Sequence, residues 1–141
     1  MSGFVSFRAM VDPSDCDVLG HMNVSRYFAA CSDGVGATQS ALGLTAEDMR
    51  SGRRISFAVV NAESDFLMEL RAGDCIWLET SIETIGTKSL TFRHKLFVAP
   101  DGKLAFSTRF KCVMLDLQTR RATDVPDEIR QKSAAFMTSA R

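Results

Sequence analysis

This 141-residue chain has no excess of charge of either sign and no long apolar run. Lys plus Arg and Asp plus Glu are both 17, a balance that excludes a strongly basic nucleic-acid-binding protein. No uncharged apolar run approaches the roughly 18 residues that a membrane helix needs. The first ten residues include Arg8 and lack the apolar core of a signal peptide. We therefore expect a cytoplasmic protein with neither a nucleic-acid nor a membrane partner, although a ligand with a few phosphates needs only local cations.

Cysteine is scarce and scattered. Cys16, Cys31, Cys75 and Cys112 form no C-x-x-C pair, so the sequence predicts neither a zinc site nor a thioredoxin-like redox motif. A secreted disulfide framework would be denser, and nothing in the sequence argues for an activated thiolate. Reduced thiols and no bound metal are the simplest interpretation.

What the sequence does contain is an ordinary globular composition, with 45% hydrophobic and 24% charged residues. The length fits one domain, residues 1–141. A compact chain of this size buries roughly 68–70% of its unfolded surface, so it needs neither a metal nor a disulfide to fold. The sequence has no internal repeat, low-complexity run or linker.

The N-terminal third predicts a strand, a polar loop and a long helix. Residues 4–11 alternate weakly and favour a strand, whereas residues 12–23 are dense in turn-forming and polar side chains. From Val24 to about Ser40, apolar residues recur at helical spacing, and Asn23 is a suitable N-cap.

The second half of the chain predicts β structure. An apolar run begins at residues 55–60, and three further segments alternate apolar and polar side chains, namely residues 76–83, 90–98 and 106–114. The short turns between them imply antiparallel hairpins, and Pro126 is placed to open a short terminal helix. One helix cannot cover both faces of such a sheet. The sequence therefore predicts an α+β architecture in which the sheet curves around the helix and a second chain covers its outer face or edge.

The segment from Asp15 to Asn23 is the most informative for chemistry. It places two carboxylates, Asp15 and Asp17, the imidazole of His21 and the amide of Asn23 directly before the predicted helix. Free backbone N–H groups at a helix start favour developing negative charge. A carboxylate aimed at an electrophile held there can act as nucleophile or general base. The residues alone therefore indicate an acyl-transfer or hydrolysis site.

The stretch DCDVLGHMNVSRYF resembles the signature D-x-D-x-x-G-H-x-N-x-x-R-Y of hotdog-fold acyl-CoA thioesterases, a group that includes the 4-hydroxybenzoyl-CoA thioesterases. The resemblance extends over nearly the whole chain, through Gly73-Asp74 and Thr87-Lys88-Ser89. It implies a hotdog fold, in which a curved antiparallel sheet wraps around one long central helix. The exposed edge of the second predicted strand leads us to expect a homodimer or homotetramer with sites at the interface. The resemblance also implies hydrolysis of an acyl-CoA to free acid and CoA without a separate cofactor, because CoA is part of the substrate.

The same resemblance implies roles for individual residues. Asp17 matches the catalytic carboxylate, acting as nucleophile or general base, and Val24 matches the residue whose backbone N–H polarises the thioester carbonyl. His21 and Asn23 would orient the loop or bind the acyl carbonyl and water. The residues implied along the pantetheine and phosphate arm of CoA are Thr87, Lys88 and Ser89.

Other functions stay open at this point. A hydratase or dehydratase on the same fold is one, although such relatives usually need a His with an Asp or Glu on the central helix, and the predicted helix lacks His. A non-catalytic acyl-CoA-binding module is another, and a lost Asp17 would be its distinguishing feature. A further branch of these thioesterases has its catalytic carboxylate on the central helix, where Asp33 is available.

Several residues also have purely structural interpretations. Asp17 could cap a turn or the helix, and His21 could be a buried anchor of the loop. His94 lies on the apolar face of a predicted strand and is expected to be a hydrogen-bonded core histidine. Gly34 and Gly36 each cost about 1 kcal/mol in a helix relative to Ala. We therefore expect close helix–sheet packing at both, or else a helix break near Gly34.

Overall fold

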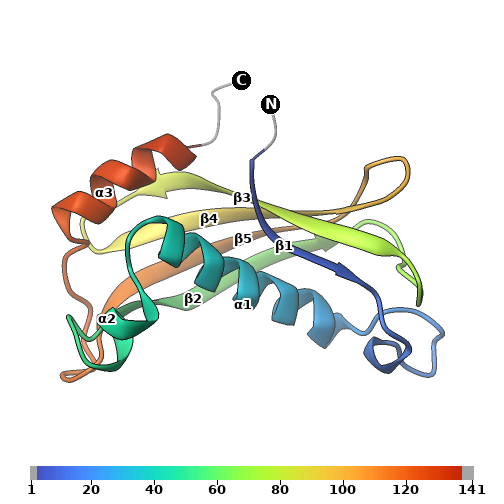
Figure 1. Cartoon of the computed structure of the whole chain (residues 1–141), viewed down its shortest axis with the longest axis horizontal. Coiled ribbons are helices and arrows are strands. Elements are labelled where there is room, and N and C mark those ends of the chain that lie inside the picture. Colours follow the sequence, from blue (N-terminus) through green and yellow to red (C-terminus); the bar gives the residue numbers. More distant parts are fainter. Residues whose placement is uncertain (1–2, 138–141) are drawn as a thin grey trace.

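The structure, a computed structural model, describes residues 3–137. Five antiparallel strands form one sheet in the order β1-β3-β4-β5-β2, and the sheet curves around the long helix α1 (Figure 1). The strands are β1 (Phe4–Met10), β2 (Ile55–Phe66), β3 (Cys75–Ile85), β4 (Ser89–Val98) and β5 (Lys103–Asp116). The helices are α1 (Val24–Ala41), α2 (Ala46–Arg50) and α3 (Asp127–Ser133), with short 3-10 turns η1 (Pro13–Asp15) and η2 (Ala134–Phe136). The α+β hotdog architecture expected from the sequence is confirmed.

The helices follow from local signals in the sequence. The side-chain Oδ1 of Asn23 caps α1 by accepting a hydrogen bond from the Ser25 N–H at 2.9 Å. The helix runs unbroken through Gly34, which confirms the predicted continuous helix and rules out the alternative of a break there. Helix α2 was not predicted because it has only five residues, although Thr45 and Asp48 form a capping box at its start. None of the helices within residues 3–137 has the length and apolarity that crossing a membrane requires.

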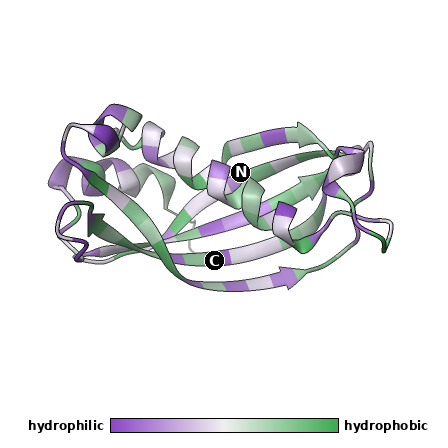
Figure 2. Cartoon of the chain, turned by 90° about the horizontal axis from the view of Figure 1, so that it is seen from below, coloured by the Kyte–Doolittle hydropathy of each residue, from purple (hydrophilic) through white to green (hydrophobic). Residues whose placement is uncertain are grey.

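The core lies between α1 and the inner face of the sheet. Apolar and polar residues alternate along the strands (Figure 2), as expected where one face of a sheet is buried. Fully buried inner-face side chains come from neighbouring strands and include Leu78, Leu96, Phe106 and Met114. Removing this apolar surface from water, at about 25 cal/mol per Å², is the main force holding the sheet on the helix.

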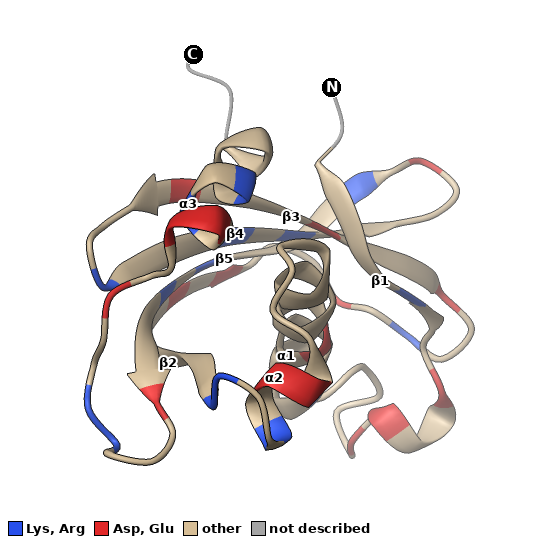
Figure 3. Ribbon diagram, turned by 60° about the vertical axis from the view of Figure 1, so that its left-hand side comes forward, with Lys and Arg blue, Asp and Glu red and all other residues tan. Residues whose placement is uncertain are grey.

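The outer face of the sheet carries charged side chains that neutralise one another. Arg93 of β4 and Arg109 of β5 lie directly opposite each other, an arrangement that is repulsive by itself. Glu83 of β3 bridges them, accepting hydrogen bonds from Arg93 Nε at 2.8 Å and from Arg109 Nε at 2.7 Å. Glu63 of β2 also pairs with Arg109. Acidic and basic positions accordingly lie side by side on β3, β4 and β5 (Figure 3).

The two glycines of α1 have different surroundings. A Cβ added at Gly34 would lie 2.6 Å from Leu78 Cδ2 and 2.8 Å from Ser6 Oγ, so this glycine lets α1 approach β1 and β3 closely. A Cβ added at Gly36 would meet nothing within 4 Å. The expectation of close helix–sheet packing is therefore confirmed at Gly34 and is wrong at Gly36.

These surroundings predict opposite effects for two matched substitutions. Gly34→Ala is expected to lower the free energy of unfolding by about 1–2 kcal/mol, because the new methyl group overpacks a buried contact. Gly36→Ala is expected to raise it by roughly 0.5–1 kcal/mol, because alanine has the better helix propensity and the site is open. Urea unfolding of both variants measures the difference, and equal effects of the two substitutions would contradict the packing described.

Candidate active site

The loop before α1 folds into a tight turn that brings Asp17 and His21 together. The Asp17 N–H donates to the His21 carbonyl at 3.2 Å, and the Gly20 N–H donates to the Asp17 carbonyl at 2.9 Å. Cys16 and Met22 form an isolated antiparallel bridge outside this turn. Gly20 has a φ of +86°, a left-handed conformation that glycine adopts without strain.

The carboxylate of Asp17 is held by two hydrogen bonds. Its Oδ2 accepts from Asn23 Nδ2 at 2.8 Å, and its Oδ1 accepts from the Leu19 N–H at 2.9 Å. These hydrogen bonds, with a smaller contribution from the charge of His21, hold the pKa of Asp17 below its ordinary value. Asp17 is therefore ionised at neutral pH and is a weak base.

Asn23 connects this carboxylate to the start of α1. Its Oδ1 caps the helix at Ser25, while its Nδ2 donates to Asp17. One side chain therefore positions both the helix start and the Asp17 carboxylate. Val24 is the first residue of α1 and is half exposed. The first N–H groups of a helix have no intrahelical partner and carry partial positive charge. An ionised carboxylate therefore lies at the helix end that carries partial positive charge.

Glu69, in the segment between β2 and β3, contributes a second carboxylate that the sequence reasoning missed. Its Oε2 lies 3.7 Å from His21 Nε2. The Met22 N–H donates to the Leu70 carbonyl at 2.7 Å, and this bond holds the loop against the segment that carries Glu69. No motif marks Glu69, because its place depends on a contact between segments far apart in the sequence.

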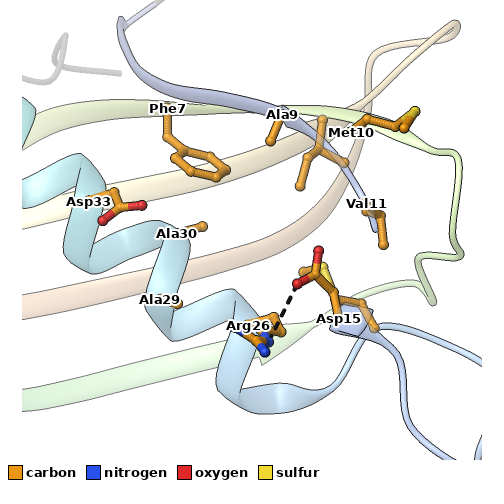
Figure 4. Close-up of a pocket in the computed structure, with 11 residues that line it drawn as sticks. Phe7, Ala9, Met10, Val11, Asp15, Arg26, Ala29, Ala30 and Asp33 are labelled. Atoms are coloured by element: carbon orange, nitrogen blue, oxygen red, sulfur yellow. Dashed lines mark ion pairs between the residues drawn. The ribbon is translucent and has the colours of Figure 1, made fainter. Parts of the chain in front are cut away.

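Asp15 has the structural role that its turn-forming character predicted. Its Oδ2 accepts from the Asp12 N–H at 2.9 Å, and its Oδ1 lies 3.4 Å from Arg26 Nε (Figure 4). Arg26, from the first turns of α1, therefore ties the loop to the helix. The pair borders a cavity of about 170 Å³ between β1 and α1, where Asp33 also lies (Figure 4). Asp33 is nine residues after Val24, about 13 Å along the helix axis, so it does not share the helix end with Asp17.

The segment expected along CoA lies at the opposite end of the molecule from Asp17 (Figure 1). It forms the turn between β3 and β4, and the 11 residues of β3 span roughly 35 Å. The Thr87 carbonyl accepts from the Val125 N–H at 2.9 Å and from Arg130 Nη2 at 3.0 Å. Lys88 is exposed, and its ammonium group makes no ion pair within residues 3–137. Thr87, Lys88 and Ser89 therefore do not meet Asp17 within one chain.

Two further expectations concern buried groups. Cys31 is fully buried, and burial raises the pKa of its thiol to about 12, which leaves no thiolate at neutral pH. His94 is a core residue as expected, and its Nδ1 lies 2.8 Å from Thr80 Oγ1. The expectation that it is fully hydrogen-bonded is wrong, because its Nε2 has no partner among the described residues.

Comparison with known proteins identifies the family of this chain. Residues 11–133 match the family model of the Thioesterase-like superfamily. The chain is 24% identical over 133 residues to a 1,4-dihydroxy-2-naphthoyl-CoA hydrolase of Trichodesmium erythraeum, covering 94% of this chain and 96% of the relative. It is 25% identical over 120 residues to the long-chain acyl-CoA thioesterase FadM of Escherichia coli, covering 82% of this chain and 86% of the relative.

Solved structures agree on the fold. A Staphylococcus aureus protein in complex with CoA matches with a TM-score of 0.87 at 19% identity, over 100% of this chain and 90% of that chain. A 1,4-dihydroxy-2-naphthoyl-CoA thioesterase from Synechocystis matches with a TM-score of 0.81 at 17% identity, over 94% of this chain and 96% of that chain. These likenesses show the hotdog fold. Since the family match spans nearly the whole sequence, the chain belongs to the Thioesterase-like superfamily.

Proposed function

We propose that this protein hydrolyses an acyl-CoA thioester to a free acid and CoA. The observation that carries the proposal is the carboxylate of Asp17, ionised and fixed by Asn23 to the N-terminus of α1 beside the Val24 amide. The named activities of the relatives, a 1,4-dihydroxy-2-naphthoyl-CoA hydrolase and a long-chain acyl-CoA thioesterase, support this class of reaction. The experiment that tests it is release of CoA thiol, followed by thiol capture, over a panel of acyl-CoA substrates.

In the proposed reaction, the Val24 N–H donates to the thioester carbonyl oxygen and stabilises the negative charge that develops there. Such a preorganised donor contributes about 2.7–4 kcal/mol in comparable oxyanion sites. Asp17 is ionised at neutral pH, so its oxygen is available to attack the carbonyl carbon as a nucleophile. The C–S bond then breaks, CoA leaves as the thiolate, and water hydrolyses the resulting anhydride to regenerate Asp17.

The other two functions are less well supported. A hydratase or dehydratase would need a proton-transferring His on the central helix, and α1 contains none. A binding module would not need an ionised carboxylate fixed at the helix end where the thioester carbonyl is proposed to bind. Thiol release without formation of a double bond separates hydrolysis from the first alternative, and turnover itself separates it from the second.

We further propose that the working unit contains at least two copies of the chain. Strand β2 is an edge of the sheet, and the exposed apolar residues on it and just after it are Val59, Val60, Phe66, Leu67 and Met68. Exposed apolar edges of this kind are sites of strand pairing. Antiparallel pairing of two β2 edges reverses the second copy, so its β3–β4 turn lies toward the Asp17 end of the first copy. Lys88 of one copy would then meet the phosphates of a CoA molecule whose thioester is bound at Asp17 of the other copy.

A complementation experiment tests this shared site. Lys88→Glu is expected to raise KM about tenfold or more, because it replaces a charge-assisted contact to phosphate by repulsion. Co-expression of Asp17→Asn and Lys88→Glu chains is expected to restore about a quarter of the wild-type rate at low substrate, because a mixed dimer holds one intact site. Light scattering on the wild-type protein measures the assembly directly. A stable monomer, or no recovery in the mixture, would contradict the shared site.

A further inference from the structure

The proposed function leaves the Glu69 carboxylate without a task, although it faces the catalytic loop. Its Oε2 is 3.7 Å from His21 Nε2, and Glu69 is more exposed than His21, with side-chain exposures of 64% and 26%. Two backbone hydrogen bonds fix the arrangement. One joins Met22 to Leu70, next to the pair, and the other joins the Asp17 N–H to the His21 carbonyl. The His21 side chain thus faces Glu69, while the His21 backbone is tied to Asp17.

We infer that Glu69 is a positioning residue that orients His21, and that His21 is the base which deprotonates the attacking water. The inference rests on the proposed thioester hydrolysis at Asp17. It assigns different roles to the two carboxylates: Asp17 attacks the substrate, and Glu69 orients the imidazole ring of His21.

The contact with Glu69 indicates which imidazole nitrogen acts as the base. Nε2 faces the Glu69 carboxylate, which accepts but cannot donate a hydrogen bond when ionised. This contact favours the tautomer with hydrogen on Nε2 and leaves the lone pair on Nδ1. A catalytic hydrogen bond is often long in the absence of substrate and shortens when substrate binds, so a separation of 3.7 Å is compatible with this role.

The hydrolysis step needs only water and the groups of this site. Water oxygen attacks the acyl carbon of the Asp17 anhydride, and one water proton passes to His21 Nδ1. The bond between the acyl carbon and the Asp17 oxygen breaks, and its electron pair returns to the carboxylate. The imidazolium then gives its proton to solvent water or to the CoA thiolate that was expelled when the anhydride formed, and this restores the neutral imidazole. Asp17 is a weak base because of its hydrogen bonds to Asn23 and Leu19, and this leaves the imidazole as the better proton acceptor.

A double-mutant cycle tests the coupling. Glu69→Gln is expected to lower kcat about tenfold with KM little changed, and His21→Gln to lower kcat roughly a hundredfold. The double variant is expected to be no slower than His21→Gln, because Glu69 acts only through His21. Glu69→Asp is expected to recover part of the loss. Glu47→Gln is the matched control, because Glu47 is similarly exposed and pairs with Arg50 on α2.

Nitrogen-15 NMR of the whole chain gives a readout that does not depend on turnover. The sequence has two histidines, so His94 serves as the internal reference for His21. We expect His21 to carry its hydrogen on Nε2 in the wild type and to become a mixture of tautomers in Glu69→Gln. An unchanged tautomer, or losses in kcat that multiply in the double variant, would overturn the inference. A wild-type protein that releases no CoA from any acyl-CoA would instead overturn the proposed function, while the tautomer measurement would still test the contact.

Discussion

Replacing Asp17 by asparagine is expected to lower kcat for acyl-CoA hydrolysis by roughly a thousandfold, because the amide can neither attack a thioester nor accept a proton. The substitution preserves the size of the side chain, and its Oδ1 can still accept from the Leu19 N–H. The new amide NH2 would face the NH2 of Asn23, so the Asn23 amide must turn and give up its cap on α1. The cap contributes about 1 kcal/mol, which predicts a small loss of stability beside the large loss of rate.

The matched control for this experiment is Asp33→Asn. Asp33 is the other carboxylate proposed from the sequence and is exposed on α1. Its side chain makes no hydrogen bond or ion pair within residues 3–137. Asp33→Asn is therefore expected to leave thiol release within about twofold of the wild type, as surface substitutions usually do. Urea unfolding shows that both variants are folded at the assay temperature. A large loss in Asp33→Asn together with a near-normal rate in Asp17→Asn would move the catalytic carboxylate onto the central helix.

The sequence predicted those parts of the site that depend on neighbouring residues. The cap at Asn23, the start of α1 at Val24 and the turn-rich loop of residues 12–23 are formed by residues within a few positions of one another. Each has a recognisable chemical signal, such as an amide before a helix or a glycine in a tight turn. The same holds for the antiparallel hairpins β3–β4 and β4–β5, because the period of two along each strand defines the buried face. A third hairpin, between the second and third strands, is implied by the sequence and is wrong, because β2 pairs with β5 at the far edge of the sheet. These local signals were sufficient for the fold and for the carboxylate at the helix end.

The parts that the sequence did not predict depend on contacts between distant segments. Glu69 meets His21 only because the loop before α1 lies against the segment between β2 and β3. Lys88 lies far from Asp17 because β3 runs the length of the molecule between them, a separation that no motif reveals. The difference between Gly34 and Gly36 likewise depends on which helix face meets the sheet. Such contacts follow from the assembled sheet and not from residue type.

Acidification from pH 6.5 to pH 4 is expected to destabilise the folded protein through His94. The imidazole is fully buried, and burial lowers its pKa from 6.5 to about 4. Between these values the unfolded chain binds a proton on His94 and the folded chain does not. The free energy of unfolding therefore falls as the pH drops through this range. Below pH 4, His94 causes no further loss. The loss expected from this difference is roughly 3 kcal/mol, a large share of the stability of a typical domain.

His94→Leu isolates this contribution. Thr80 keeps its hydrogen bond to Ser6 Oγ at 2.7 Å, so removing the imidazole leaves no polar partner stranded, and the unpartnered Nε2 disappears with it. The free energy of unfolding, measured in urea from pH 7.5 to pH 4, is expected to fall less steeply in His94→Leu than in the wild type. His21→Gln is the control, because it removes the other histidine, which is partly exposed.

The difference in the free energy of unfolding between wild type and His94→Leu is more informative than either curve alone. This is because protonation of carboxylates also destabilises both proteins in acid. The pKa values of Asp17, Asp48 and Asp116 are lowered from 3.8 by their hydrogen bonds, so their contributions are lost mainly below pH 4 in both proteins. Subtracting the two curves removes these shared terms and leaves the part that titrates between pH 6.5 and pH 4. A flat difference over that range would mean that the folded protein accommodates a charged imidazole at this position. The surrounding rings of Phe92 and Phe110 would then have to open to water, because neither can hydrate an imidazolium.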